Sequence, residues 1–184
     1  MALGSWFLNN QMDKQRKYAE TGKMLFSIEG TKYCRFIPPD SSFFLAKDSS
    51  LLYRGLQGDF SVFLGGNWRF ELIVDSHTGL CTHIQSYLKK MEVKARSLDL
   101  PDSIVRDLYF VSSNTLEHGG GCHYHPFLNM AFWDGMKKLL CFGDPNSKGE
   151  AIEFTPKTIA IIKDAQLKSM YLVLDGIDME ISFS

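Results

Sequence analysis

The chain has 184 residues, of which 45% are hydrophobic and 22% are charged, and its formal net charge at pH 7 is -1. This length is sufficient to bury a self-sufficient core, and we expect a single globular domain over residues 1–184. A charge balance so close to zero supplies no long-range field to attract nucleic acid or an anionic membrane, so neither is expected as a partner. The densest basic stretch, residues 89–96, is diluted by Glu92 and indicates a solvated strand face.

The cysteines and the N-terminal residues indicate the compartment. The four cysteines stand at positions 34, 81, 122 and 141, and no two of them form a CxxC pair. This spacing excludes local zinc-ribbon and redox motifs. The N-terminus has no basic stretch before its short apolar run, and no apolar segment approaches the roughly 20 residues of a membrane-spanning helix. We therefore expect a cytoplasmic protein whose thiols are all reduced.

One surface helix is expected near the N-terminus, at residues 11–21. Asn9 or Asn10 can cap its start, and Gly22 stands where a left-handed C-cap belongs. After it the strand signals begin. Residues 24–28 and 32–37 flank a Glu-Gly-Thr turn and predict a hairpin, which Pro38 and Pro39 end because neither can donate to a sheet ladder.

The clearest unit follows at residues 59–88. Phe60, Val62 and Leu64 alternate with other residues on one side of the turn Gly65-Gly66-Asn67, and a second alternating run covers residues 68–75. Period-two alternation on both sides of such a turn predicts a hairpin. Residues 80–88 return as a third strand, which gives an antiparallel meander.

The remaining segments also favour strands. The hairpin at residues 127–142 is expected to turn through Asp134-Gly135, a dipeptide suited to a two-residue type I′ turn. A short helix can replace a strand in 77–91 or 127–140, because short apolar runs are ambiguous by period. The other expected strands are residues 91–98, 104–112, 151–154, 158–163, 167–174 and 179–183.

This succession predicts the fold class. Short strands at near-regular spacing, together with 14 Phe and 7 Tyr residues, favour pleated sheet. We expect a mainly β protein, or an α+β protein with a dominant antiparallel sheet. The sheet would be a sandwich, a barrel or a curled meander.

One stretch has the composition of a functional site: residues 117–127, Glu-His-Gly-Gly-Gly-Cys-His-Tyr-His-Pro-Phe. We expect it to form a loop after residues 104–112. An extended chain through residues 123–125 places His123 and His125 on one face, because side chains alternate along a strand. His118 can fold back across the three glycines as a third ligand, with Glu117 as an available carboxylate. Such a set suits zinc or iron. As a plain turn, the same segment binds no cofactor, and this is the expected state.

The pair His123 and His125 is similar to the His-x-His of the first motif of the cupins. The resemblance implies a metal-dependent small-molecule enzyme or binding protein that uses His118, His123 and His125. Asn129 stands where that motif has glutamate, Gly135 lies near its closing glycine, and no histidine beyond position 125 supplies the second motif.

Two catalytic interpretations lack a required partner. His118 and the glycines after it are similar to the oxyanion-hole segment of lipases and esterases, but the chain has no Gly-x-Ser-x-Gly nucleophile elbow. Cys122 stands beside His123, yet neighbouring strand residues point to opposite faces, so His123 is poorly placed as its base.

The absence of an acid–base pair or an activated nucleophile on a local frame favours a non-catalytic function. We expect a protein-interaction module of the inhibitor or toxin-neutralising immunity protein kind, with another protein as its partner. Asp175, Asp178 and Glu180 cluster around Gly176 and are the candidate partner-binding residues. A solvated turn explains the same acidic cluster equally.

Overall fold

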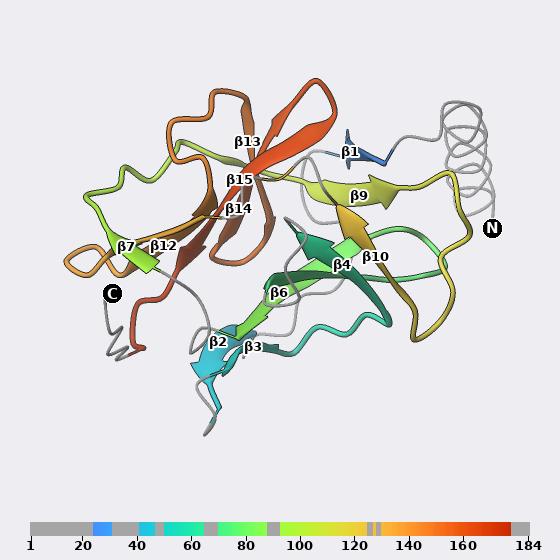
Figure 1. Cartoon of the computed structure of the whole chain (residues 1–184), viewed down its shortest axis with the longest axis horizontal. Coiled ribbons are helices and arrows are strands. Elements are labelled where there is room, and N and C mark those ends of the chain that lie inside the picture. The colour runs from blue at the N-terminus through green and yellow to red at the C-terminus, as the bar shows by residue number, and fades with distance from the viewer. Residues whose placement is uncertain are drawn as a thin grey trace.

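A computed structural model describes residues 24–30, 41–46, 50–64, 70–87, 93–124, 127 and 130–177 of the chain. These residues form fifteen strands in three sheets of two, six and seven strands, so the protein is mainly β (Figure 1). The strands are β1 (Leu25–Glu29), β2 (Ser42–Leu45), β3 (Ser50–Arg54), β4 (Phe60–Leu64), β5 (Phe70–Val74), β6 (Cys81–Tyr87), β7 (Val93–Ala95), β8 (Ile104–Val105), β9 (Asp107–Val111), β10 (Gly121–Tyr124), β11 (Ala131–Asp134), β12 (Leu139–Gly143), β13 (Glu150–Thr155), β14 (Thr158–Lys163) and β15 (Gln166–Val173).

The six-stranded sheet has the order β10-β4-β5-β6-β3-β2 and contains the predicted meander. Strands β4, β5 and β6 pair antiparallel in succession, with Val62 opposite Leu72 and Leu72 opposite Ile84. The alternating apolar residues of β4 and β5 are all buried: Phe60, Val62, Leu64, Phe70, Leu72 and Val74. The three-stranded antiparallel prediction is therefore confirmed.

The seven-stranded sheet has the order β7-β11-β12-β15-β14-β13-β8. Its five central strands pair antiparallel, whereas β7 and β8 add parallel to β11 and β13 at the two edges. Seven strands leave six intervals of about 4.8 Å, or about 29 Å between the edges. The nine steps from Ala95 to Ile104 reach at most about 32 Å, so segment 96–103 must cross the sheet nearly extended.

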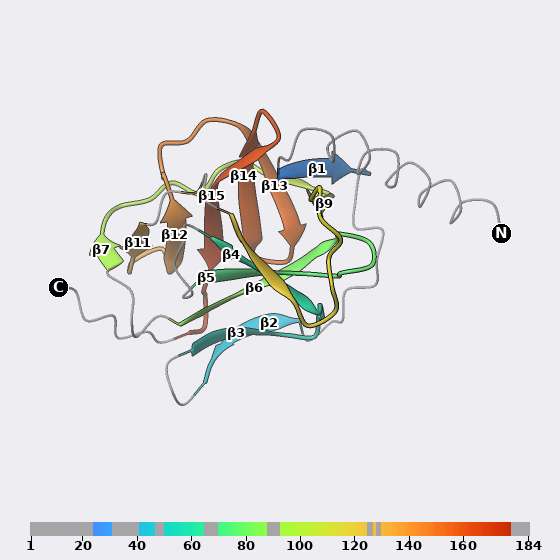
Figure 2. The ribbon, with the colours of Figure 1, turned by 45° about the vertical axis from the view of Figure 1, so that its right-hand side comes forward.

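The two large sheets pack face to face over the main core (Figure 2). The rings of Phe70 in β5 and Phe142 in β12 stack with centroids 3.6 Å apart. Tyr124 of β10 lies in the same core, where its hydroxyl oxygen accepts a hydrogen bond from the Leu167 N–H at 3.1 Å. Alternation along the strands thus gives each sheet one face for this shared core.

A second apolar cluster lies on the outer face of the seven-stranded sheet. Leu98 of the crossing segment belongs to it, and the Tyr171 hydroxyl donates to the Pro145 carbonyl of loop 144–149 at 2.8 Å. Arg96 ties the two segments together through a 2.7 Å hydrogen bond to Asn146. Both segments therefore lie on this face. Its buried members are Leu98, Phe132, Leu139, Cys141, Ile159, Ile161 and Tyr171.

Several local expectations need correction. Residues 121–124 were expected as part of a loop, but they form β10 and pair parallel with β4. Local sequence patterns could not reveal this strand, because its partner is distant in the sequence. Residues 104–112 divide between β8 and β9, which belong to different sheets. No helix replaces a strand in the described parts of 77–91 or 127–140.

The Asp134-Gly135 hairpin forms, but its loop has four residues instead of two. Asp134 pairs with Leu139, and Lys138 takes the left-handed conformation with φ of 51°. The Asp134 carboxylate accepts the N–H groups of Met136 and Lys137, which stabilises the longer turn.

Other expectations fall outside the described residues: the helix at 11–21, the strands at 32–37 and 179–183, and Cys34. The described cysteines, Cys81, Cys122 and Cys141, are free thiols. Strand β1 pairs antiparallel with β9. In the part of the chain that the structure describes, no helix has the length and apolar character needed to cross a bilayer.

Candidate functional site

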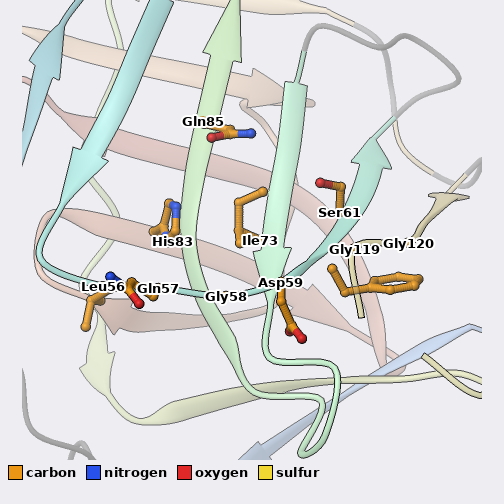
Figure 3. A pocket seen from close by; sticks show the side chains of 11 residues that line it. Leu56, Gln57, Gly58, Asp59, Ser61, Ile73, His83, Gln85, Gly119 and Gly120 are labelled. Carbon is orange, nitrogen blue, oxygen red and sulfur yellow. The ribbon is translucent and has the colours of Figure 1, made fainter. Parts of the chain in front are cut away.

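A cleft of about 430 Å³ opens on the outer face of the six-stranded sheet, on the side away from the seven-stranded sheet (Figure 3). Its floor is formed by side chains that point the same way from β4, β5 and β6, and the chain before β4 and the glycine loop before β10 form its walls. The lining residues are Leu56, Gln57, Gly58, Asp59, Phe60, Ser61, Ile73, His83, Gln85, Gly119 and Gly120.

Glycines let the walls approach the sheet closely. A Cβ atom on Gly58 would lie 2.8 Å from both Ile73 Cγ2 and Thr82 Oγ1. Gly119 takes a φ of 71°, a conformation that costs glycine little. The Gly119 N–H donates to the Asp59 carbonyl at 2.7 Å, and the Ser61 N–H donates to the Gly120 carbonyl at 3.0 Å. The glycine loop is thereby fixed to the start of β4.

Asp59 lies on the rim of the cleft and accepts three hydrogen bonds. The Ser76 N–H donates to Oδ1 at 2.7 Å, and the Ser76 hydroxyl donates to Oδ2 at 2.6 Å. The His118 Nδ1–H donates to Oδ2 at 2.5 Å. These donors, the Ser76 hydroxyl above all, hold the pKa of Asp59 far below its usual range. Asp59 therefore joins the β5–β6 turn to the glycine loop.

Glu71 of β5 is a buried carboxylate on the same face as the cleft. Only 7% of its surface is exposed. The Ser61 hydroxyl of β4 donates to Glu71 Oε2 at 3.1 Å, and the Gln85 amide of β6 donates to the same oxygen at 2.8 Å. Both donors line the cleft. Three neighbouring strands thus hold one buried carboxylate, which is bonded to two residues of the cleft lining.

His83 is also buried and lines the cleft. The Thr82 hydroxyl has one hydrogen, which it donates to the Ile73 carbonyl at 3.0 Å. The 3.1 Å contact between Thr82 Oγ1 and His83 Nδ1 therefore requires the proton on Nδ1 of His83. The Tyr53 ring stacks on this imidazole at a centroid distance of 5.9 Å. These contacts fix both the tautomer and the orientation of His83.

The two described histidines of the predicted set, His118 and His123, contact different parts of the six-stranded sheet. His118 stands on the cleft rim with 86% of its side chain exposed, paired with Asp59. His123 lies in β10, where its ring is 5.3 Å from the Phe63 ring. His125 lies outside the described residues. Among the residues that the structure describes, no group of three or more His, Cys, Asp or Glu side chains is arranged to hold a metal ion.

Cys122 and the predicted acidic cluster complete the list of sequence candidates. Cys122 is half-buried, and burial raises the pKa of its thiol to about 11. Asp175 is exposed and accepts a 2.6 Å ion-pair contact from Lys157. Asp178 and Glu180 lie outside the described residues. Asp175 directly follows β15 of the seven-stranded sheet, whereas the cleft lies on the six-stranded sheet.

Sequence reasoning missed Ser61, Glu71, His83 and Gln85. Each is a polar residue at an alternate position of a strand, where such residues ordinarily indicate a solvated face. Glu71 lies opposite Gln85 because a β-bulge shifts the register by one residue between Ile73 and Val74, and the predicted meander contained no bulge. Neither the pairing of the acid with the amide nor the burial of the acid was therefore within reach of the sequence.

The arrangement supplies recognition chemistry, since the cleft offers oriented acceptors, one fixed imidazole and backbone walls. Among the described residues, His118 is the one exposed imidazole that a carboxylate orients. Comparison of the sequence with protein-family models and with curated proteins finds no match.

Proposed function

We propose that this protein is a non-catalytic protein-interaction module of the inhibitor or toxin-neutralising immunity protein kind. The observation that carries the proposal is Met136, which stands on the β11–β12 turn with 96% of its surface exposed. A single exposed apolar side chain is ordinary on a protein surface, but one held on a fixed turn beside a groove can anchor a partner. Methionine adapts its shape to irregular partner surfaces.

The turn that presents Met136 is held from several sides. The Asp134 carboxylate accepts the Met136 and Lys137 N–H groups, each at 3.1 Å, and the Leu98 N–H at 2.9 Å. The Lys137 ammonium donates to the Leu98 carbonyl at 2.5 Å. The Leu174 N–H donates to the Lys138 carbonyl at 2.8 Å. A turn fixed in this way has little conformational entropy to lose when a partner binds.

Charged groups and a shallow groove surround the anchor. A groove of about 360 Å³ runs beside it, lined by Arg96 and Trp133 among others. Asp175 and Lys157 pair at the same end of the sheet, next to the backbone contact between Leu174 and Lys138. We name Met136, this groove, Lys157 and Asp175 the turn surface. An apolar centre with a charged rim is the usual composition of a protein interface.

Affinity capture from the source cell tests the proposal. We expect the full chain to retain a protein that Met136→Glu loses, because the substitution places a charge at the anchor. The matched control is Tyr87→Glu, which changes another exposed apolar residue on the other large sheet. Capture that is equal for all three proteins, or restricted to small molecules, contradicts the proposal.

The charged rim should act on the rate of association. Asp175→Lys replaces an exposed acid of the turn surface by a base, so we expect a basic partner to associate more slowly, most clearly at low salt. The dissociation rate should change less. Stopped-flow or surface-based kinetics at two salt concentrations measures both rates.

A metal-dependent small-molecule enzyme or binding protein is the second candidate. The contact between His118 and Asp59 favours it, because metal-binding histidines commonly donate their second ring N–H to a carboxylate. His123 and His125 would be the other ligands, for zinc or iron. Elemental analysis of the purified protein tests this candidate. A stoichiometric metal that disappears in the His123→Ala, His125→Ala double variant supports it, and a metal-free protein contradicts it.

A further inference from the structure

We infer that the cleft on the six-stranded sheet binds an alkylguanidinium or alkylammonium group. Its source is either a free small molecule or an arginine or lysine side chain of a protein. The cleft lies on β4, β5 and β6, whereas the turn surface lies on the other large sheet. The inference therefore goes beyond the proposed function and does not depend on it.

Two residues of the cleft lining, Ser61 and Gln85, donate to Glu71 and keep acceptors for a ligand. The Ser61 hydroxyl donates its single hydrogen to Glu71, so its oxygen can only accept a further bond. Gln85 donates from Nε2 to Glu71 and keeps its side-chain carbonyl as an acceptor. Glu71 receives both bonds on Oε2, and no described donor contacts Oε1. A complementary ligand must therefore bring donors.

The charge of this site points to a cation. Glu71 is almost fully buried, its described donors are two neutral groups, and no described Lys or Arg pairs with it. A desolvated carboxylate gains most from a charged donor, because charge-assisted hydrogen bonds are roughly twice as strong as neutral ones. Asp59 places a carboxylate in the cleft lining itself. Its oxygens are occupied by Ser76 and His118, so it contributes through its charge.

The shape of the cleft suits a cationic head on an alkyl stem. Its volume of about 430 Å³ lies within the range of small-molecule sites, roughly 300–1,000 Å³. Leu56 and Ile73 provide apolar contact for methylene groups, while Gly119 and Gly120 leave the opposite wall without side chains. A planar guanidinium can donate to more than one of these acceptors together, which favours it over ammonium.

Titration of the full-length ¹⁵N-labelled protein tests the inference. The amide resonances of Gly58, Gly119 and Gly120 report on the cleft walls. The probes are methylguanidinium and its neutral isostere methylurea, at constant ionic strength. We expect saturable shifts of the three glycine resonances, with an affinity for methylguanidinium about tenfold or more above that for methylurea, since about 1.4 kcal/mol corresponds to tenfold.

Variants separate Glu71 from general surface charge. Glu71→Gln should weaken methylguanidinium binding by about tenfold or more, and the control Asp102→Asn, at an exposed acid between β7 and β8, should leave it unchanged. If Glu71→Gln does not fold, Gln85→Leu removes an acceptor of the cleft and should weaken binding several-fold. Absent shifts, equal shifts with methylurea, or full binding by the folded variants would overturn the inference.

The source of the cation is decided by a second pair of probes. Acetyl-Gly-Arg-Gly-amide should bind more tightly than methylguanidinium if the natural ligand is a protein side chain, and no more tightly if it is a free small molecule. Met136→Glu should leave both titrations unchanged. Loss of protein capture in Met136→Glu with an intact cleft titration would thus separate the turn surface from the cleft.

Discussion

The seven-stranded sheet turns Phe132, Cys141 and Tyr171 away from the inter-sheet core, whereas the six-stranded sheet turns Glu71 and His83 away from it. Segments 96–103 and 144–149 lie on the first face and bury its apolar residues. The second face keeps an open cleft whose polar groups bond to one another. Equal strand periodicity therefore produces a covered apolar face on one sheet and an open polar face on the other.

The largest expected effect is on the covered face. Ile161→Ala should lower the free energy of unfolding by about 2–5 kcal/mol, because it removes a buried side chain and leaves a cavity. Gln57→Ala, at an exposed residue of the cleft, should change it by less than about 0.5 kcal/mol. Urea unfolding measures both. Similar losses for the two variants would show that the first face is not a second core.

The two sides of β10 should also differ. Tyr124→Phe removes the acceptor of the buried Leu167 N–H, and we expect it to lower the free energy of unfolding by about 1–3 kcal/mol. His123→Ala, on the neighbouring residue, should cost less than about 1 kcal/mol, since His123 packs on Phe63 away from the core. The same unfolding measurement compares them. A larger cost for His123→Ala would assign the histidine a structural or metal-binding role.

The sequence predicted the elements that depend on neighbouring residues. Period-two alternation identified β4, β5 and β6 with their buried residues, because only a few residues separate the strands of each pair along the chain. The parallel partners of β7, β8 and β10 were not predictable in this way, since each lies far along the chain.

The candidate site was predicted less well than the fold. His118 was named from its glycine-rich surroundings, but its partner Asp59 is 59 residues away and depends on the fold. Glu71 looked like a solvated residue of an alternating strand. Its burial comes from a face that local sequence cannot distinguish from an exposed one.

Thiol reactivity sharpens the contrast between covered and open surfaces. Burial raises the pKa of the Cys141 thiol to about 12, and that of the Cys122 thiol to about 11. Thiolates are the reactive form, and Cys141 is fully buried whereas Cys122 is half-buried. We expect iodoacetamide to modify Cys122 of the native protein before Cys141, as measured by peptide mapping. The reverse order would place an opening over the covered face.

Two aspartates, one on each sheet, provide the finest comparison. The pKa of Asp134 is lowered mainly by backbone N–H donors, and the Leu98 N–H has the largest effect. The pKa of Asp59 is lowered mainly by a side-chain donor, the Ser76 hydroxyl. A carboxyl with a lowered folded pKa contributes stability above the ordinary aspartate pKa of about 3.9, and this contribution is lost as pH falls through the folded value. Both aspartates therefore stabilise the native protein at neutral pH and lose that effect only in acid.

Side-chain substitution should move one of these pKa values and not the other. Ser76→Ala should raise the pKa of Asp59 most, and His118→Ala should raise it less, because the Ser76 hydroxyl precedes His118 among the causes. Lys137→Ala should leave the pKa of Asp134 nearly unchanged, since the backbone N–H of residue 137 remains. Titration of the side-chain carboxyl ¹³C resonances measures all three. If His118→Ala moves the pKa of Asp59 further than Ser76→Ala does, the histidine and not the serine is the main partner of Asp59 at the rim of the cleft.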